Sequence, residues 1–300
     1  MSAKKSFITP PFMAGLTASV LAVIKLVFGL SSGSMAVASS ALDSLGDCLV
    51  SAINFFALKK ASAQPNEKFN FGYGKIEALT TLFEGFFIMG AGLFVAYSGV
   101  MKILNPEPID FSIGAVVMVI SLVMTTALVI YLRRAAAKYD SMIIYADATH
   151  YQVDLLTNAA TLAALIVVHF SGLVIIDALF GIGVSAYIVL QAMPLIKKSV
   201  YMLLDGSLPT EITDEIKELI AKKEPILSTH LIRTRKSGNI CYFGVHLVFD
   251  PNITLAKAHE CEEELEKEIR ERFSQNKWIF EIHFDITDDE EIERGEIWVS

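Results

Sequence analysis

The chain has 300 residues, 53% of them hydrophobic, and a mean hydropathy of +0.49. This composition is too apolar for a wholly water-soluble protein and predicts membrane spans. The net charge of −8 is unevenly spread: residues 1–205 carry 13 basic and 12 acidic side chains, while residues 206–300 carry 12 and 21. The sequence therefore predicts a transmembrane domain over residues 1–205 and an acidic, cytosolic domain over residues 206–300.

Six apolar stretches of about twenty residues or more predict transmembrane helices. We expect them at Pro11–Leu30, Met35–Leu58, Ile76–Met101, Phe111–Leu132, Met142–Phe170 and Leu173–Leu204. Eleven Lys and Arg residues flank the spans at alternate ends, against only Lys102 at the opposite ends. Because basic flanks stay on the cytosolic side, both termini are predicted to be cytosolic.

Two of these spans carry ionisable side chains at the same spacing. Asp43 and Asp47 stand in the second span, and His150 and Asp154 in the fifth. The i, i+4 spacing places each pair on one face of its helix. Ionisable groups within a span are costly and usually face an ion pathway. Three carboxylates and one imidazole suit a divalent transition metal. The pattern favours metal transport over the alternative that each Asp merely hydrogen-bonds a neighbouring helix.

The acidic region predicts one small domain. Its periodicities indicate the order α-β-β-α-β, which is typical of an open α+β sandwich. The expected elements are Glu211–Lys223, Ser228–Lys236, Ile240–Asp250, Leu255–Phe273 and Trp278–Ile286.

Alternation along the last strand assigns its two faces. Five large apolar residues alternate and so share the core side: Trp278, Phe280, Ile282, Phe284 and Ile286. His283 and Asp285 therefore share the other side, and His246 of the preceding strand also points away from the apolar face. Two imidazoles and a carboxylate on one face predict a metal site there.

Four sequence stretches in order carry a family resemblance. They are Asp43-Ser44-Leu45-Gly46-Asp47, Phe71-Gly72-Tyr73-Gly74-Lys75, His150-Tyr151-Gln152-Val153-Asp154 and Leu204-Asp205-Gly206-Ser207. Together with six spans and this tail, they resemble a cation diffusion facilitator of the bacterial zinc/cadmium/iron subgroup over nearly the whole chain. The resemblance implies a homodimer in the bacterial inner membrane that exchanges cytosolic divalent metal for external protons.

The same resemblance implies roles for individual residues. Asp43, Asp47, His150 and Asp154 would form the transport site. The tail would be ferredoxin-like and metallochaperone-like, with a two-metal site drawn from five residues: His230, His246, His259, His283 and Asp285. Lys75 and Asp205 would form a charge pair that ties the third and sixth spans together. The alternative for Lys75 is simply a cytosolic flanking charge.

Ligand chemistry narrows the choice of metal. Imidazole favours Zn²⁺, our first choice, with Cd²⁺ and Fe²⁺ as alternatives. Ion ligands must lose their protons, so metal and protons compete for the same side chains, and His150 is the natural proton carrier. A passive metal channel or a sensor stays open as an alternative. The sequence contains no HExxH motif of a metalloprotease, and we expect neither enzymatic activity nor a nucleic-acid partner. In the tail the ion would be regulatory or structural.

Overall fold

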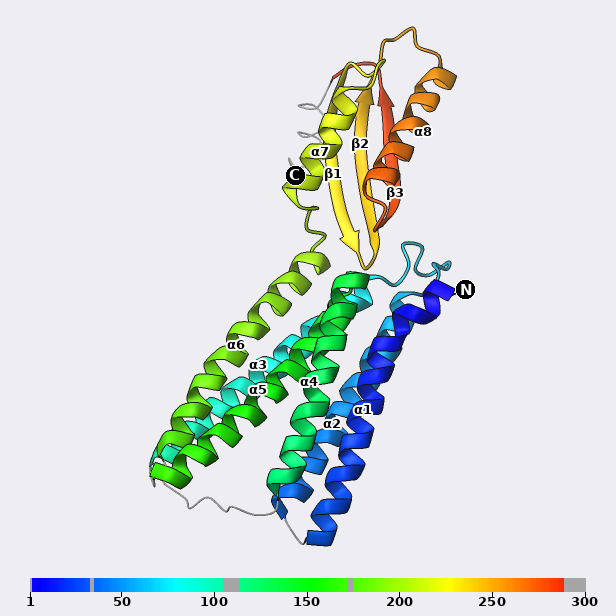
Figure 1. The fold of residues 1–300 in the computed structure, drawn as a ribbon. Helices are drawn as coiled ribbons and strands as arrows, with labels where there is room; N and C mark the ends of the chain where they lie inside the picture. The colour runs from blue at the N-terminus through cyan, green and yellow to red at the C-terminus, as the bar shows by residue number, and fades with distance from the viewer. Residues whose placement is uncertain (1, 33–34, 105–113, 172–174, 289–300) are drawn as a thin grey trace. The chain divides into compact units, whose positions relative to one another are not determined.

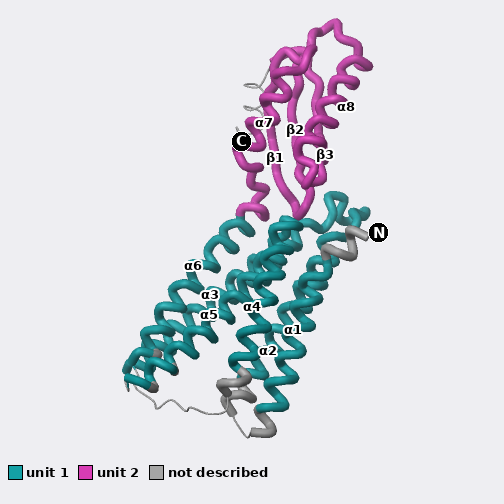
Figure 2. The backbone as a smooth tube through the Cα atoms, in the orientation of Figure 1, with its two compact units in different colours: residues 1–200 teal, residues 201–300 magenta. Residues whose placement is uncertain are grey.

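The structure is a computed structural model that describes residues 2–32, 35–104, 114–171 and 175–288 (Figure 1). The chain forms two compact units, Met1–Val200 and Tyr201–Ser300 (Figure 2). Each unit has its own apolar core, and the two are described separately below.

The first unit is a bundle of long helices. They are α1 (Ser2–Ser32), α2 (Met35–Ala61), α3 (Lys75–Leu104), α4 (Gly114–Tyr139), α5 (Met142–Ser171) and α6 (Ile175–Leu203). Among the described residues, all six helices contain a stretch that is long and apolar enough to cross a membrane. The prediction of six spans is confirmed.

Helix α3 shows how these helices divide their surface between the bundle and the lipid. Its buried positions are mostly small or polar: Glu77, Ala78, Thr81, Glu84, Gly85, Ile88, Gly92 and Gly99. Its large aromatic residues point outward, with Phe83 68% and Phe94 69% exposed. Small residues let transmembrane helices approach closely, whereas lipid tails accept large apolar side chains. The helix therefore turns its polar side inward.

Helix α5 lies between two apolar clusters. One joins it to α1, α2 and α4 through residues that include Ala14, Leu58, Leu132 and Tyr151. The other joins it to α3 and α6 and is made of Ile88, Ala146, Val153, Ile188, Ala192 and Leu195. Helix α5 is therefore packed on both flanks against neighbouring helices.

The second unit has the elements α7 (Thr210–Ala221), β1 (Ser228–Ser237), β2 (Ile240–Val248), α8 (Leu255–Arg272) and β3 (Lys277–Asp285). The predicted α-β-β-α-β order is confirmed. The strands form one sheet in the order β1-β2-β3, with β1 antiparallel and β3 parallel to β2. Ile216 and Ile220 of α7 and Leu265 and Ile269 of α8 pack with Phe243 and its neighbours in the core.

Strand pairing aligns three histidines across the sheet. His246 in β2 stands opposite His230 in β1 and opposite His283 in β3. An irregularity follows His230, where the register shifts and Leu231 adopts a φ of 50°. Such a bulge changes the direction of the strand's side chains. The row of histidines thus depends on a local break that the alternating pattern does not reveal.

The predicted core face of β3 is confirmed for four of its five residues. Trp278 is buried, and Phe280, Ile282 and Phe284 pack against the same core. Ile286 was assigned to this face wrongly, since its side chain is 61% exposed. The reason is that β3 ends at Asp285, so the alternation no longer holds beyond it.

Glycines on α3 set how closely α6 approaches. A Cβ atom built on Gly92 would lie 2.9 Å from Ile188 Cγ2, whereas one on Gly90 meets nothing within 4 Å. We expect Gly92→Leu to destabilise the bundle by about 1–3 kcal/mol through overpacking. Gly90→Leu should be neutral or slightly stabilising, because leucine favours a helix more than glycine does. Thermal unfolding of the two variants in lipid would test this, and equal stabilities would contradict it.

Candidate metal centres

The intramembrane site joins α2 and α5 around one imidazole nitrogen. His150 Nε2 lies 3.1 Å from Asp47 Oδ1 and 3.6 Å from Asp154 Oδ2. The ligand atoms of these three residues all lie within 4.8 Å of one another. The His150 ring is buried and lies beside the rings of Phe87 and Tyr151. A proton on Nε2, or a cation in its place, would therefore face both carboxylates.

Asp154 offers further evidence for a cation. Its Oδ2 atom is buried and, apart from His150 Nε2 at 3.6 Å, has no polar partner among the described residues. A buried carboxylate oxygen without a donor is costly unless a cation or proton compensates it. Nitrogen and oxygen donors in this arrangement fit a divalent transition metal.

Asp43 stands apart from this cluster. It lies one helical turn before Asp47 on α2, and its side chain is exposed. The structure thus brings together three of the four predicted ligands, Asp47, His150 and Asp154, without Asp43.

One cation near this site was not assigned a role from the sequence. Lys25 of α1 is only 8% exposed, and its Nζ donates a hydrogen bond to Ser44 Oγ at 2.8 Å. Ser44 lies between Asp43 and Asp47 in the sequence. A lone lysine in the middle of an apolar span is a signal that could have pointed to this place.

Sequence reasoning also missed a buried polar cluster made by three helices. Asn54 of α2 contacts Glu84 of α3 and Asp147 of α5, and all three side chains are buried. These residues are 30 and 93 positions apart from Asn54, so no spacing in the sequence connects them.

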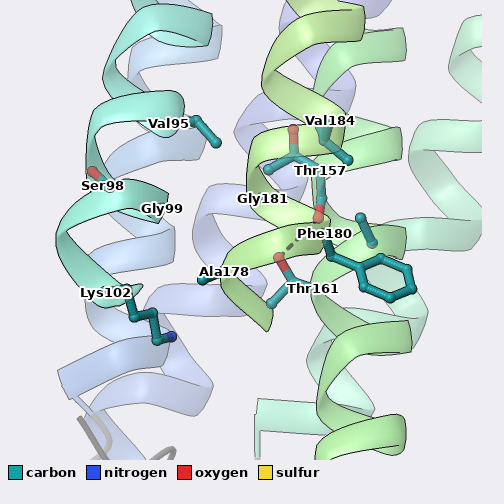
Figure 3. Close-up of a pocket in the computed structure, with 11 residues that line it drawn as sticks. Val95, Ser98, Gly99, Lys102, Thr157, Thr161, Ala178, Phe180, Gly181 and Val184 are labelled. Atoms are coloured by element: carbon teal, nitrogen blue, oxygen red, sulfur yellow. Dashed lines mark hydrogen bonds between the residues drawn. The ribbon is translucent and has the colours of Figure 1, made fainter. Parts of the chain in front are cut away.

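A separate pocket of about 320 Å³ opens between α3, α5 and α6 (Figure 3). Its polar residues include Ser98, Lys102, Thr157 and Thr161. The two threonine hydroxyls donate to backbone carbonyls of their own helix. The described lining contains no carboxylate, imidazole or thiol, and the Lys102 ammonium repels cations. The pocket therefore lacks the chemistry of a metal site.

In the second unit the aligned histidines meet one carboxylate. Asp285 Oδ2 lies 2.8 Å from His246 Nδ1 and 3.3 Å from His230 Nε2, while Oδ1 lies 3.1 Å from His283 Nε2. The ligand atoms of His230, His246 and Asp285 lie within 4.8 Å of one another. The His283 ring lies beside that of His246, with 4.7 Å between the ring centroids and the planes tilted by 38°. Three imidazoles and one carboxylate match the donors that zinc prefers.

His259 lies elsewhere, on the exposed side of α8. Its Nδ1 is 3.0 Å from Glu262 Oε2, and Glu263 lies 3.6 Å from its other ring nitrogen. The hydrogen bond with Glu262 raises the pKa of His259. The structure therefore does not bring this predicted ligand into the cluster around Asp285.

Lys75 and Asp205 fall in different units, and their pairing stays a prediction. Within its own unit, Asp205 Oδ1 accepts a hydrogen bond from Arg235 Nη1 at 3.3 Å. Asp205 follows the end of α6 with a φ of 56°. The Gly206 amide donates a hydrogen bond to the Tyr201 carbonyl at 2.8 Å, and this bond caps the C-terminal end of α6.

Comparisons with known proteins identify the family of this chain. A model of the cation efflux transmembrane domain matches residues 12–204, and one of the cytoplasmic domain of cation efflux proteins matches residues 208–285. The cation-efflux pump FieF of Shewanella oneidensis is 39% identical over 245 residues, which cover 81% of this chain and 82% of that protein. FieF of Klebsiella pneumoniae is 34% identical over 85% of each chain, and FieF of Cronobacter sakazakii is 33% identical over 87% of each. The chain therefore belongs to the cation diffusion facilitator family of cation efflux transporters, with a multi-pass membrane domain and a cytoplasmic C-terminal domain.

Proposed function

We propose that this protein exports Zn²⁺ from the cytosol in exchange for protons, as a homodimer in the bacterial inner membrane. The observation that carries the proposal is the meeting of Asp47, His150 and Asp154 at one imidazole nitrogen inside the bundle. Relatives named as cation-efflux pumps in bacteria support the direction of transport, and the mixed nitrogen and oxygen donors favour Zn²⁺ over harder ions. Cd²⁺ and Fe²⁺ are the alternative substrates.

Exchange follows from the ligands themselves. The three side chains bind a cation only after losing their protons, so each metal ion that binds releases protons. When the site opens to the proton-rich side, protonation weakens the ligands and the metal leaves. Alternating access between the two sides then couples the opposite flows.

Asp43 completes the transport site in this proposal. It lies one turn from Asp47 on the same helix, so a modest rotation or shift of α2 changes its distance from His150. A ligand that joins the site in one conformation and leaves it in another makes the affinity depend on conformation. Such differential affinity is what an ion needs in order to shift a conformational equilibrium.

In the same proposal, the cytoplasmic domain binds metal ions that regulate transport or stabilise the domain. His230, His246, His283 and Asp285 hold one ion, and His259 with neighbouring carboxylates supplies the ligands for the second. The Lys75–Asp205 pair connects the third and sixth spans beside the dimer interface.

Removing one intramembrane ligand should abolish transport. We expect Asp47→Ala and Asp154→Ala each to lower Zn²⁺ transport into liposomes by more than about a hundredfold, since even indirect supporting partners of a metal site contribute up to that factor. Glu67→Ala, which changes an exposed loop carboxylate, is the control and should keep the wild-type rate. Near wild-type transport by either site variant would place the transport site elsewhere.

The pH gradient separates exchange from passive flow. Wild-type transport should rise when the metal-receiving compartment supplies protons, and it should carry protons in the opposite direction. Transport that responds only to the Zn²⁺ gradient, with no proton flux, would instead identify a passive channel.

The imidazole should set the choice of metal. Changing His150→Asp makes the site all-oxygen, so we expect the preference to move from Zn²⁺ toward Mn²⁺. The measurement is a competition between the two ions in liposomes for wild type and variant. If the preference is unchanged, packing around the site determines selectivity rather than the ligand at this position.

The cytoplasmic ions should be separable by mutation. In the full-length Asp47→Ala protein, adding His283→Ala and Asp285→Ala should remove one ion, and adding His259→Ala should remove the other. The ion at His259 should also be lost as the pH falls, because the raised pKa keeps this imidazole protonated up to a higher pH. Calorimetric titrations over a pH series would measure both effects, and unchanged stoichiometry in either variant would refute that part of the site.

A further inference from the structure

The cluster of Asn54, Glu84 and Asp147 buries two carboxylates that the metal site does not use. Their side chains come from α2, α3 and α5, and the residues are 1%, 5% and 0% exposed. Asn54 Nδ2 donates hydrogen bonds to Glu84 Oε2 and to Asp147 Oδ1, each at 3.3 Å. Because both oxygens contact the same nitrogen, they lie within twice that distance of each other.

The second oxygen of each carboxylate accepts no hydrogen bond from Asn54. Glu84 Oε1 and Asp147 Oδ2 are buried, and neither oxygen has a partner with hydrogen-bond geometry among the described residues, although the Ser51 hydroxyl of α2 also acts on the Asp147 carboxylate. An ionised carboxylate oxygen buried without a donor costs free energy, and two such charges side by side cost more. A proton removes one charge and turns one bare oxygen into a hydroxyl.

The position of that proton follows from the hydrogen bonds. Asn54 donates its N–H groups to Oε2 and Oδ1, so these oxygens act as acceptors. The acid proton therefore resides on Glu84 Oε1 or Asp147 Oδ2. Two carboxyl groups that share one proton titrate as a pair, and neither residue alone owns it.

The charged surroundings link this pair to the metal site. Asp47 of α2 and His150 of α5 act electrostatically on it. From α5, Tyr151 hydrogen-bonds to Ser51 of α2 at 2.9 Å. On the remaining helices, Lys25 of α1 contacts Ser44, and Gln152 of α5 contacts both Arg133 of α4 and Tyr187 of α6.

We propose that Glu84 and Asp147, bridged by Asn54, form a proton-binding site separate from the metal ligands. The pair holds one proton while the metal site is empty and releases it to water when a divalent cation binds at Asp47, His150 and Asp154. The O–H bond of one carboxyl breaks, the proton leaves, and the new positive charge nearby stabilises the second carboxylate. The release step rests on the proposed metal site, whereas the bound proton does not.

Infrared spectroscopy tests the bound proton in the full-length, metal-free protein in lipid. A protonated carboxyl group gives a C=O stretching band distinct from that of a carboxylate. We expect such a band at neutral pH and its reduction in the double variant Glu84→Gln/Asp147→Asn, which keeps the shapes of both side chains. Glu67→Gln removes an exposed loop carboxylate and should leave the band unchanged. An equal band in wild type and double variant would overturn the proposal.

Proton counting tests the release. Calorimetric Zn²⁺ titrations in buffers of different ionisation enthalpy give the number of protons released per metal bound. We expect about one fewer in the double variant than in wild type, and the contribution of the cytoplasmic ions cancels in the difference. An equal count with metal still bound would refute the coupling.

If the double variant does not fold, the Glu84→Gln and Asp147→Asn single variants, each of which breaks the pair, give the same comparison of band and count.

The two hypotheses fail in different ways. If Asp47→Ala and Asp154→Ala retain metal transport, the proposed transport site is wrong, but the infrared band still reports on the carboxyl pair. If the band is insensitive to Glu84 and Asp147 while transport depends on Asp47 and Asp154, only the proton site is wrong.

Discussion

Burial of ionisable side chains in an apolar bundle is the constraint on which this membrane domain depends. A carboxylate within a span is stable only when a proton, a cation or a set of donors compensates it. Helix α5 carries three such groups, Asp147, His150 and Asp154, and packs on both flanks against apolar clusters. Asp147 and His150 are buried there, and side chains of α2 contact both of them. Asp47 of α2 contacts His150, and Asn54 of α2 contacts Asp147 and also Glu84 of α3.

Local sequence patterns predicted those features that depend on a single helix or strand. Six spans follow from hydropathy, and the i, i+4 spacing of His150 and Asp154 indicated the ionisable face of α5. Alternation in β3 placed Phe280 in the core and His283 on the other side, as observed. These predictions succeed because the signal and the structure share one period.

Features built from distant residues could not be predicted in the same way. Asn54, Glu84 and Asp147 meet only when three helices pack, and an isolated Asn carries no sign of its partners. The bulge at Leu231 lets β1 and β2 pair on both sides of a register shift, although alternation alone predicts an unbroken strand. The position of Asp43 outside the cluster depends on the rotation of α2 about its axis, which the i, i+4 rule does not determine.

The row of histidines has a mechanical consequence for the cytoplasmic domain. Neighbouring strands lie about 4.8 Å apart, and the ring centroids of His230, His246 and His283 follow with separations of 5.0 and 4.7 Å. An ion held by this row would fasten all three strands together through their side chains, in addition to the backbone ladder. Strands β1 and β3 each pair only with β2, so this cross-link would add a second connection for both. Metal loading should therefore slow the amide hydrogen exchange of β1 and β3 and delay their detachment from the sheet, so that occupancy becomes a measure of how firmly the two edge strands are held.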